Sequence, residues 1–361
     1  IEQFNRLPEG RQPPASEESF MEYRSLGRTG VQVSVLCLGC MNFGFPTPEE
    51  EALDMIDVAL EAGVNFIDTA NVYNLRRSEE IVGRALQRNG RRDRIVLATK
   101  VHGRMDDNDI LAAGNNRRHI IAQCEASLRR LQTDYIDLYQ IHRPDSTVPI
   151  DETLRALDDL IRAGKVRYIG TSTFPAWQVM DSIWIAKELG LNRFVTEQPP
   201  YHLLDRSIER ELVPLAQTYG LAILPWSPLA RGFLSGRYQR GQEVPGDSRV
   251  ARDMQGPMAE RTKKHFSELA FQVLDEVQAL ASEKGCTPSQ VALAWCLRQP
   301  GITSPIIGPR TRAHLDDNLG AVNVEITAAD RARLDAVAEP EQAIVPYYTG
   351  KLIDFKPLVH R

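Results

Sequence analysis

The sequence predicts a single (β/α)8 barrel, an α/β fold in which a closed ring of eight parallel strands is surrounded by helices. Eight short runs of the chain are almost continuously apolar, as parallel strands buried on both faces require. Most runs follow a helix stop, usually a glycine, and most begin about 26 to 42 residues after the previous one, the length of one strand–helix unit. The runs are 33–36, 65–68, 95–100, 135–142, 166–170, 193–196, 221–224 and 304–308.

Length and composition are compatible with this fold. The chain has 361 residues, of which 42% are hydrophobic and 25% are charged, and its formal net charge is −5. The length alone also allows two domains, and a doubly wound open sheet is the alternative architecture. That alternative is disfavoured because no Gly-x-Gly-x-x-Gly motif follows the first predicted strand. Residues 27–30, which precede that strand, indicate the turn of an N-terminal hairpin.

The composition excludes several classes of protein. No run of 18 or more apolar residues is present, so we expect no membrane-spanning helix and no membrane partner. No stripe of Lys and Arg is present either, which argues against a nucleic-acid partner. The CxxC pair Cys37 and Cys40 has no second pair to complete a zinc site, so no metal is expected. Because this pair lies in an apolar run, we expect buried, reduced thiols and a cytoplasmic protein.

Helical patterns separate the predicted strands. Thr47-Pro48 opens one helix, with Pro48 in a first-turn position where no N–H is needed. Thr287 and Gln290 form a predicted capping box at the start of a later helix. Apolar residues at helical spacing define the buried faces; examples are Leu53, Ile56 and Leu60; Ile121, Cys124, Leu128 and Leu131; and Leu154, Leu157 and Ile161.

Three parts of the chain are predicted. Residues 1–20 form an N-terminal tail or arm, 21–340 form the barrel domain, and 341–361 form a C-terminal tail that contributes to the substrate pocket. The connection between the seventh and eighth strands is about 80 residues long and contains a polar stretch, 237–264, rich in Gly and Pro. Connections of this length are usually functional lids or disordered.

Polar side chains occur where three of the predicted strands end. Asp68 closes the second strand, Lys100 the third and His142 the fourth, and Tyr73 lies in the loop that follows Asp68. The carboxyl ends of barrel strands meet at one mouth, so these four side chains converge there. Any one of them alone favours a structural role, as part of an Asp–Lys pair or as a capping His. The four together favour catalysis.

The chemistry that suits these four residues is proton donation to a carbonyl group. A phenol with a pKa of about 10 is a weak acid at neutral pH, and a nearby ammonium lowers such a pKa. Asp68 holds and neutralises Lys100, and a neutral His142 orients the carbonyl oxygen. The missing component is a hydride donor, which side chains cannot provide.

The motifs around these residues resemble the signature of the aldo-keto reductases. The resemblance is carried by Asp-Thr-Ala-Asn-Val-Tyr at 68–73, Ser-Glu-Glu-Ile-Val-Gly-Arg-Ala-Leu at 78–86, Leu-Gln-Thr-Asp-Tyr-Ile-Asp-Leu at 131–138 and His142. It covers the chain from about residue 26 to 338. By this resemblance Tyr73 is the general acid/base, Lys100 and Asp68 tune it, His142 positions the carbonyl, and NADPH or NADP+ lies across the barrel mouth.

The resemblance also implies a set of cofactor contacts. Ser172 and Gln198 hold the nicotinamide, and Thr173 stands where the family has an Asn. Trp226 stacks on the nicotinamide, with core packing as its alternative role, and Arg310 binds the 2′-phosphate that distinguishes NADPH from NADH. The full set is Cys40, Met41, Asp68, Ser172, Thr173, Gln198, Trp226, Ser227, Leu229, Arg231, Gly232, Arg237, Arg249, Gly308, Arg310, His314, Asp317 and Asn318.

The chain departs from the family pattern beside the catalytic tyrosine. Many relatives have Tyr-Gly-x-Gly, whereas this chain has Tyr-Asn-Leu-Arg at 73–76. Loss of both glycines stiffens this loop and places Arg76 near the entrance, where we expect it to form an ion pair or to meet a polar substrate. Met41, where relatives often have Thr or an aromatic residue, provides a softer pocket wall.

The sequence therefore predicts an NADPH-dependent reductase of aldehydes or ketones with a small-molecule partner. Two alternatives remain open at this stage: an NADP-dependent alcohol or sugar dehydrogenase that works in the oxidative direction, and a non-catalytic, NADPH-sensing protein like channel subunits of the family. The identity of the substrate and the oligomeric state are not predicted.

Overall fold

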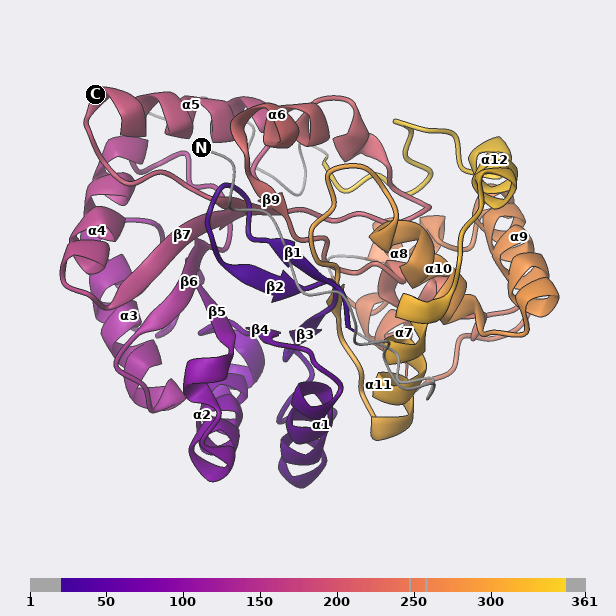
Figure 1. The fold of residues 1–361 in the computed structure, drawn as a ribbon, viewed down its shortest axis with the longest axis horizontal. Helices are drawn as coiled ribbons and strands as arrows, with labels where there is room; N and C mark the ends of the chain where they lie inside the picture. Colours follow the sequence, from indigo (N-terminus) through magenta and orange to yellow (C-terminus); the bar gives the residue numbers. More distant parts are fainter. Residues whose placement is uncertain (1–20, 247, 257–258, 349–361) are drawn as a thin grey trace, which may run out of the picture.

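The predicted (β/α)8 architecture is confirmed by the computed structural model, which describes residues 21–246, 248–256 and 259–348 (Figure 1). Eight parallel strands form one sheet in the order β10-β3-β4-β5-β6-β7-β8-β9. They are β3 (Cys37–Gly39), β4 (Phe66–Asp68), β5 (Val96–Val101), β6 (Ile136–Ile141), β7 (Val166–Ser172), β8 (Thr196–Gln198), β9 (Ala222–Ile223) and β10 (Ile306–Ile307).

The two end strands of this sheet approach each other across the last gap. Ile223 and Trp226 form isolated parallel bridges with Ile302 and Ile306. The N–H of Thr303 donates to the carbonyl of Ile223 at 2.9 Å, and that of Ile306 donates to the carbonyl of Pro225 at 2.8 Å. These bonds close the ring of the eight-stranded sheet between the seventh and eighth barrel strands.

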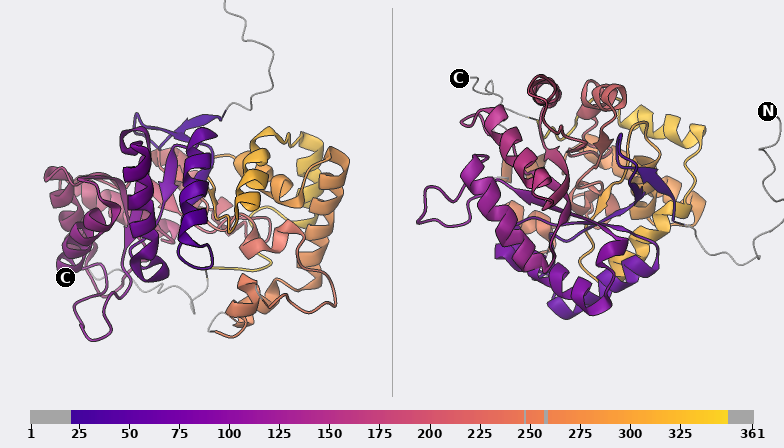
Figure 2. Two further views of the ribbon diagram at one scale, coloured as in Figure 1. Left: turned by 90° about the horizontal axis from the view of Figure 1, so that it is seen from below. Right: turned by 60° about the vertical axis from the view of Figure 1, so that its left-hand side comes forward.

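Helices surround the strands (Figures 1 and 2). They are α1 (Glu49–Glu61), α2 (Arg77–Asn89), α3 (Arg117–Leu131), α4 (Ile150–Arg162), α5 (Ala176–Glu188), α6 (Leu212–Tyr219), α7 (Arg249–Asp253), α8 (Ala259–Lys264), α9 (Glu268–Lys284), α10 (Pro288–Leu297), α11 (Arg312–Leu319) and α12 (Ala328–Val337). The predicted capping box of Thr287 and Gln290 is present at the start of α10. Pro48 directly precedes α1 as its N-cap. Among the described residues, no helix is both long and apolar enough to span a bilayer.

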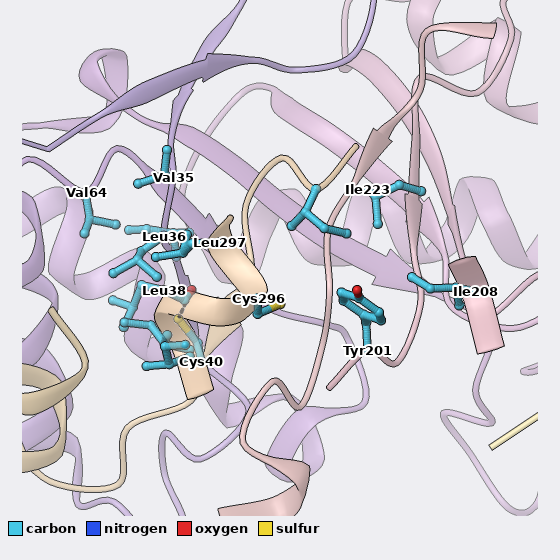
Figure 3. Packing of buried hydrophobic residues seen from close by; sticks show 14 of the residues in the cluster. Val35, Leu36, Leu38, Cys40, Val64, Tyr201, Ile208, Ile223, Cys296 and Leu297 are labelled. Atoms are coloured by element: carbon cyan, nitrogen blue, oxygen red, sulfur yellow. Dashed lines mark hydrogen bonds between the residues drawn. The ribbon is translucent and has the colours of Figure 1, made fainter. Parts of the chain in front are cut away.

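The hydrophobic core has an outer and an inner part. The outer cluster lies between the strands and the helices, and Figure 3 shows members of it, including Leu38 of β3, Ile223 of β9 and Cys296 of α10. The inner cluster fills the barrel itself and includes Phe66 and Leu138. Strands buried on both faces explain why the apolar runs are continuous rather than alternating.

An antiparallel hairpin of β1 (Tyr23–Ser25) and β2 (Gln32–Ser34) covers the amino-terminal end of the barrel. Leu26 and Val33 from this hairpin belong to the inner cluster. Gly27 at the turn has a φ of +59°, and a Cβ there would lie 2.7 Å from the carbonyl oxygens of Val195 and Gly220. Glycine is therefore required for this close approach. Figure 2 (left) shows the indigo hairpin and the α7–α8 segment at opposite ends of the barrel.

Two predicted strand positions were wrong. The run 33–36 is not the first barrel strand: Val33 and Ser34 belong to the hairpin, and β3 starts only at Cys37. The sixth strand begins at Thr196, where the predicted run ended. At the first position the apolar run continues past a change of partner, so hydropathy does not reveal where the strand begins. At the second position the strand is the polar triplet Thr196–Gln198, which an apolar pattern does not detect.

The long connection after β9 has secondary structure of its own. It contains α7 and α8, so the predicted polar stretch is not one uninterrupted loop. Aromatic rings pack together on both sides of these helices in the chain: Phe233 contacts Tyr238, Phe266 and Phe271, with ring centroids 5.2–6.2 Å apart. This segment stands at the mouth of the barrel, beside the site described next (Figure 2).

Candidate functional site

The four predicted catalytic residues meet at the carboxyl-terminal mouth of the barrel. Asp68 is the last residue of β4, Lys100 lies in β5, and His142 follows β6 directly. Tyr73 begins a short 3₁₀ turn, η1 (Tyr73–Arg76), in the loop after β4. Parallel pairing of β4 with β5 and of β5 with β6 brings these strand ends side by side.

Lys100 is the centre of the cluster. Its side chain is fully buried, and its ammonium donates to Oδ1 of Asp68, to the carbonyl of Thr69 at 2.9 Å and to the hydroxyl of Tyr73 at 3.1 Å. Burial lowers the pKa of Lys100, but the Asp68 carboxylate and the Tyr73 hydroxyl raise it by more, so the net direction is upward. Lys100 therefore keeps its charge inside the barrel, with an acceptor for each of its three protons.

Two glutamines hold the other oxygen of Asp68. Oδ2 accepts from Nε2 of Gln140 at 3.1 Å and from Nε2 of Gln198 at 3.0 Å. Nε2 of Gln198 also donates to Oε1 of Gln140 at 3.2 Å. Gln140 was missed by sequence reasoning. Its signal was an amide two residues before His142, near the carboxyl end of a mostly apolar strand.

His142 contributes a neutral ring next to the tyrosine. Its ring meets that of Tyr73 edge to face, with centroids 5.6 Å apart. Burial lowers the pKa of His142 well below its usual value, and the positive charges of Arg143 and Lys100 lower it further. The imidazole is therefore uncharged at neutral pH and can donate one N–H into the mouth.

The loop after Tyr73 has an unusual backbone. Asn74, Leu75 and Arg76 have φ angles of 46°, 53° and 82°, in the left-handed region that favours glycine. Asn74 compensates for this conformation, because its Nδ2 donates to the carbonyls of Met41, Phe43 and Phe45 at 2.8–2.9 Å. These bonds attach the loop of Tyr73 to the loop after β3. Sequence reasoning missed Asn74.

Arg76 does not form the ion pair that the sequence suggested. It is exposed and donates to the main-chain carbonyl of Met105 at 2.5 Å, and no carboxylate of the described residues pairs with it. It therefore connects the loop after β4 with the loop after β5.

A cavity of about 510 Å³ extends from Asp68, Tyr73 and His142 across the mouth. It brings together most of the predicted cofactor residues, namely Met41, Asp68, Ser172, Gln198, Trp226, Ser227, Leu229, Arg231, Gly232, Arg237, Gly308, Arg310, His314, Asp317 and Asn318. Cys40 and Thr173 are fully buried and do not line it. Arg249 begins α7, and its side chain lies outside the described residues. Arg231 is already paired with Asp253.

Several features of the cavity suit a dinucleotide. Nε1 of Trp226 is buried and has no hydrogen-bond acceptor among the described residues. Arg237 and Arg310 supply positive charge, and Thr311 caps the N-terminus of α11 by accepting from the N–H of His314 at 3.3 Å. Helix N-termini and arginines both favour phosphate groups. Within the described ranges, no cluster of His, Cys, Asp and Glu could hold a metal ion.

The chain end supplies one wall of the cavity. Tyr347 packs edge to face on Trp226 with ring centroids 5.0 Å apart. Its N–H donates to Oδ2 of Asp205 at 2.7 Å, and the N–H of Val345 donates to the carbonyl of Leu204 at 2.9 Å. Residues 349–361 of the predicted C-terminal tail lie outside the described residues.

The cysteines take no part in this site. All five are free thiols, and all except Cys286 are buried, as the sequence predicted for Cys37 and Cys40. Burial raises the pKa of Cys37 and Cys40 well above the usual value, and the charge of Asp68 raises both further. Neither thiol is therefore available as a nucleophile.

A (β/α)8 barrel with a buried Asp–Lys–Tyr cluster and a neutral histidine at its mouth belongs to the oxidoreductases that act on carbonyl groups. The Aldo/keto reductase family model matches residues 35–339, and the chain belongs to that family.

Curated relatives agree with this assignment. The uncharacterized oxidoreductase YrpG of Bacillus subtilis is 41% identical over 85% of this chain and 92% of its own. A probable voltage-gated potassium channel subunit beta of Oryza sativa is 38% identical over 84% of this chain and 92% of its own. The versiconal hemiacetal acetate reductase of Aspergillus parasiticus is 36% identical over 89% of this chain and 98% of its own.

Proposed function

We propose that the protein is an NADPH-dependent reductase that converts an aldehyde or a ketone to an alcohol, with Tyr73 as the proton donor. The observation that carries this proposal is the Tyr73 hydroxyl 3.1 Å from the buried ammonium of Lys100, itself paired with Asp68. When bound, the nicotinamide supplies hydride to the carbonyl carbon. The residues of this chain supply the proton and hold the carbonyl in place.

Proton delivery follows from the contacts of Lys100. The alkoxide oxygen takes the proton of Tyr73, and the adjacent ammonium stabilises the phenolate that remains. Asp68 keeps Lys100 charged, and Gln140 and Gln198 keep Asp68 oriented. No large rearrangement is needed, since every partner is already in place.

His142 orients the reacting oxygen. Its neutral ring donates an N–H to the carbonyl oxygen, so that the oxygen lies between the imidazole and the Tyr73 hydroxyl. Burial favours the neutral imidazole most, and a protonated ring next to Arg143 and Lys100 would add a third positive charge.

The residues that would hold the cofactor line the same cavity. Trp226 and Ser172 face the nicotinamide end, and Gln198, whose Nε2 is occupied by Asp68 and Gln140, offers its Oε1 to an amide N–H. Arg310, near the N-terminus of α11, suits the 2′-phosphate of NADPH. We place the protein in the cytoplasm, where free buried thiols stay reduced.

The oxidative direction uses the same residues, because acid and base exchange roles when the reaction reverses. A second alternative is a non-catalytic, NADPH-sensing protein, because some relatives are named as channel subunits. A protein that only binds the cofactor can retain the residues Asp68, Tyr73, Lys100 and His142. Turnover separates these cases: NADPH oxidation with 4-nitrobenzaldehyde supports the reductase, and turnover only with NADP+ and an alcohol supports the dehydrogenase.

The test of the proton donor is Tyr73→Phe. We expect kcat to fall by about 100-fold or more, since general acid catalysis contributes a factor of that order. Quenching of tryptophan fluorescence by NADPH provides the control, because cofactor binding should persist. Near-normal carbonyl reduction by the variant would show that Tyr73 is not the acid.

A further inference from the structure

Arg143 is a cation at the reacting end of the cavity that neither the family motifs nor the proton relay uses. It follows His142 directly and lines the same cavity as Tyr73 and His142. Its Nη1 donates to the carbonyl of His142 at 2.9 Å and to the hydroxyl of Thr173. These two bonds hold the guanidinium beside the histidine. In the described part of the chain, only Nη1 donates to a protein acceptor.

Arg143 has no carboxylate partner among the described residues, in contrast to the other cations around the reacting end. Lys100 is paired with Asp68, and Arg231 is paired with Asp253. A half-buried guanidinium without a counterion is unfavourable, because it has lost part of its hydration without gaining a partner.

Neither Asp145, two residues further along the chain, nor Glu197 forms an ion pair with Arg143 among the described residues. Asp145 accepts hydrogen bonds from the hydroxyl of Thr147 at 2.6 Å and from the main-chain N–H of Asn115 at 3.0 Å. Glu197 is fully buried, and burial raises the pKa of its carboxyl to about 8, while hydrogen bonds from Thr171 and Phe174 and the charge of Arg143 oppose this rise. Neither carboxyl therefore forms an ion pair with the guanidinium of Arg143 in the described part of the chain.

We propose that Arg143 binds an anionic group of the substrate, so that the pocket selects aldehydes or ketones that also carry a carboxylate or a phosphate ester. The planar guanidinium offers Nε and Nη2 as a fork to two oxygens of such a group. Binding there places the anion beside His142, and the carbonyl of the same molecule can reach the Tyr73 hydroxyl. This inference rests on the proposed reductase function and specifies its substrate class.

The charge is tested with matched pairs of aldehydes. 4-Carboxybenzaldehyde and methyl 4-formylbenzoate differ only in the anion, as do glyceraldehyde 3-phosphate and glyceraldehyde. In the native protein we expect kcat/KM to be at least about tenfold higher for the anionic member of one pair, the size of one charge-assisted contact. Which pair shows the preference distinguishes a carboxylate substrate from a phosphate ester.

The residue is tested with Arg143→Met, which keeps length without charge, and Arg143→Lys, which keeps charge without the fork. Arg143→Met should abolish the preference through a higher KM for the anionic aldehyde, and Arg143→Lys should restore part of it. Arg76→Ala is the matched control, because it removes a cation from the entrance but not from the cavity. An unchanged preference in Arg143→Met, or an equal loss in Arg76→Ala, overturns the proposal.

A binding measurement keeps this test separate from the reductase proposal. Benzoate and inorganic phosphate can be titrated calorimetrically into the native protein and into Arg143→Met, whether or not either turns over an aldehyde. Weaker binding of one anion to the variant supports the anion site even if no carbonyl is reduced. Equal binding of both anions to the two proteins overturns it, and an Arg143→Met variant that loses NADPH affinity without any change for anions assigns Arg143 to the cofactor instead.

Discussion

The two halves of the barrel interior differ sharply although the same strands build both. Toward the amino-terminal end, the inward positions are Phe66 of β4, Ala98 of β5 and Leu138 of β6, all in the inner hydrophobic cluster. Two residues further along each strand the inward positions become Asp68, Lys100 and Gln140. A strand places every second residue on one face. On each of these strands, the inward residue that packs the core and the inward residue of the polar cluster are therefore only two positions apart.

The comparison shows that the apolar half makes the polar half possible. A buried ammonium and carboxylate are costly to desolvate, and they persist only where every oxygen and proton has a partner. The inner cluster, sealed by Leu26 and Val33 of the hairpin, keeps water away from the lower side of Lys100. The site therefore opens toward the mouth.

The largest effect is expected from Lys100→Met, which breaks the polar half. It leaves the Asp68 carboxylate buried without its cation, so we expect a loss of about 3–5 kcal/mol in the free energy of unfolding. Carbonyl reduction should also fall by about 100-fold or more. Urea denaturation and an NADPH assay measure the two losses. Adding Asp68→Asn should recover part of the stability but none of the activity; recovery of activity would contradict the proposed role of Lys100.

Leu138→Ala tests the apolar half. Deleting a buried leucine side chain leaves a cavity in the inner cluster, and we expect about 2–5 kcal/mol of destabilisation. At a temperature where the variant is folded, kcat should stay within a few-fold of the native value, because the catalytic contacts lie one pleat away. A loss of activity as large as that of Lys100→Met, in a folded protein, would show that the two halves are not separable.

A matched pair in the tyrosine loop tests how that side chain is positioned. Asn74→Gly removes the three hydrogen bonds to the loop after β3 but relieves the left-handed backbone, and Leu75→Gly relieves the backbone only. We expect kcat/KM to fall about tenfold in Asn74→Gly, because small displacements of a catalytic group are costly. Leu75→Gly should stay within a factor of two. Similar behaviour of the two variants would show that Asn74 does not position Tyr73.

The smallest effect concerns pH. Burial and then the charge of Arg143 lower the pKa of His142, so its neutral form persists well below pH 6.5 in the native protein. Removing that charge in Arg143→Met raises this pKa toward the usual value. The acidic limb of kcat/KM for a neutral aldehyde should therefore move to higher pH. A pH profile checks this, and a limb that stays in place would exclude His142 as the group responsible.

How far the sequence predicts this molecule depends on the kind of feature. The barrel and the meeting of Asp68, Tyr73, Lys100 and His142 at its mouth could be predicted, because apolar runs and the polar residues at their ends are properties of position along the chain. Gln140 lay hidden inside a run, since its importance comes from the direction of one side chain. Asn74 acts through a backbone conformation, and Tyr347 through a contact with Trp226, far away in sequence. Neither backbone angles nor distant contacts can be derived from local pattern.

The contact between Tyr347 and Trp226 places part of the cavity wall on a segment that carries none of the four predicted catalytic residues. Substrate selectivity can therefore change there separately from the proposed chemistry. The proposed proton delivery depends on β4 and β5, whose inward residues also pack the barrel interior. A substitution in these strands therefore lowers the free energy of unfolding as well as the activity. The segment of Val345 and Tyr347 is attached to the barrel by main-chain bonds to Leu204 and Asp205 and carries no relay residue. Val345 and Tyr347 are themselves buried, so a substitution here costs packing, but it can change the wall of the cavity without touching the four predicted catalytic residues.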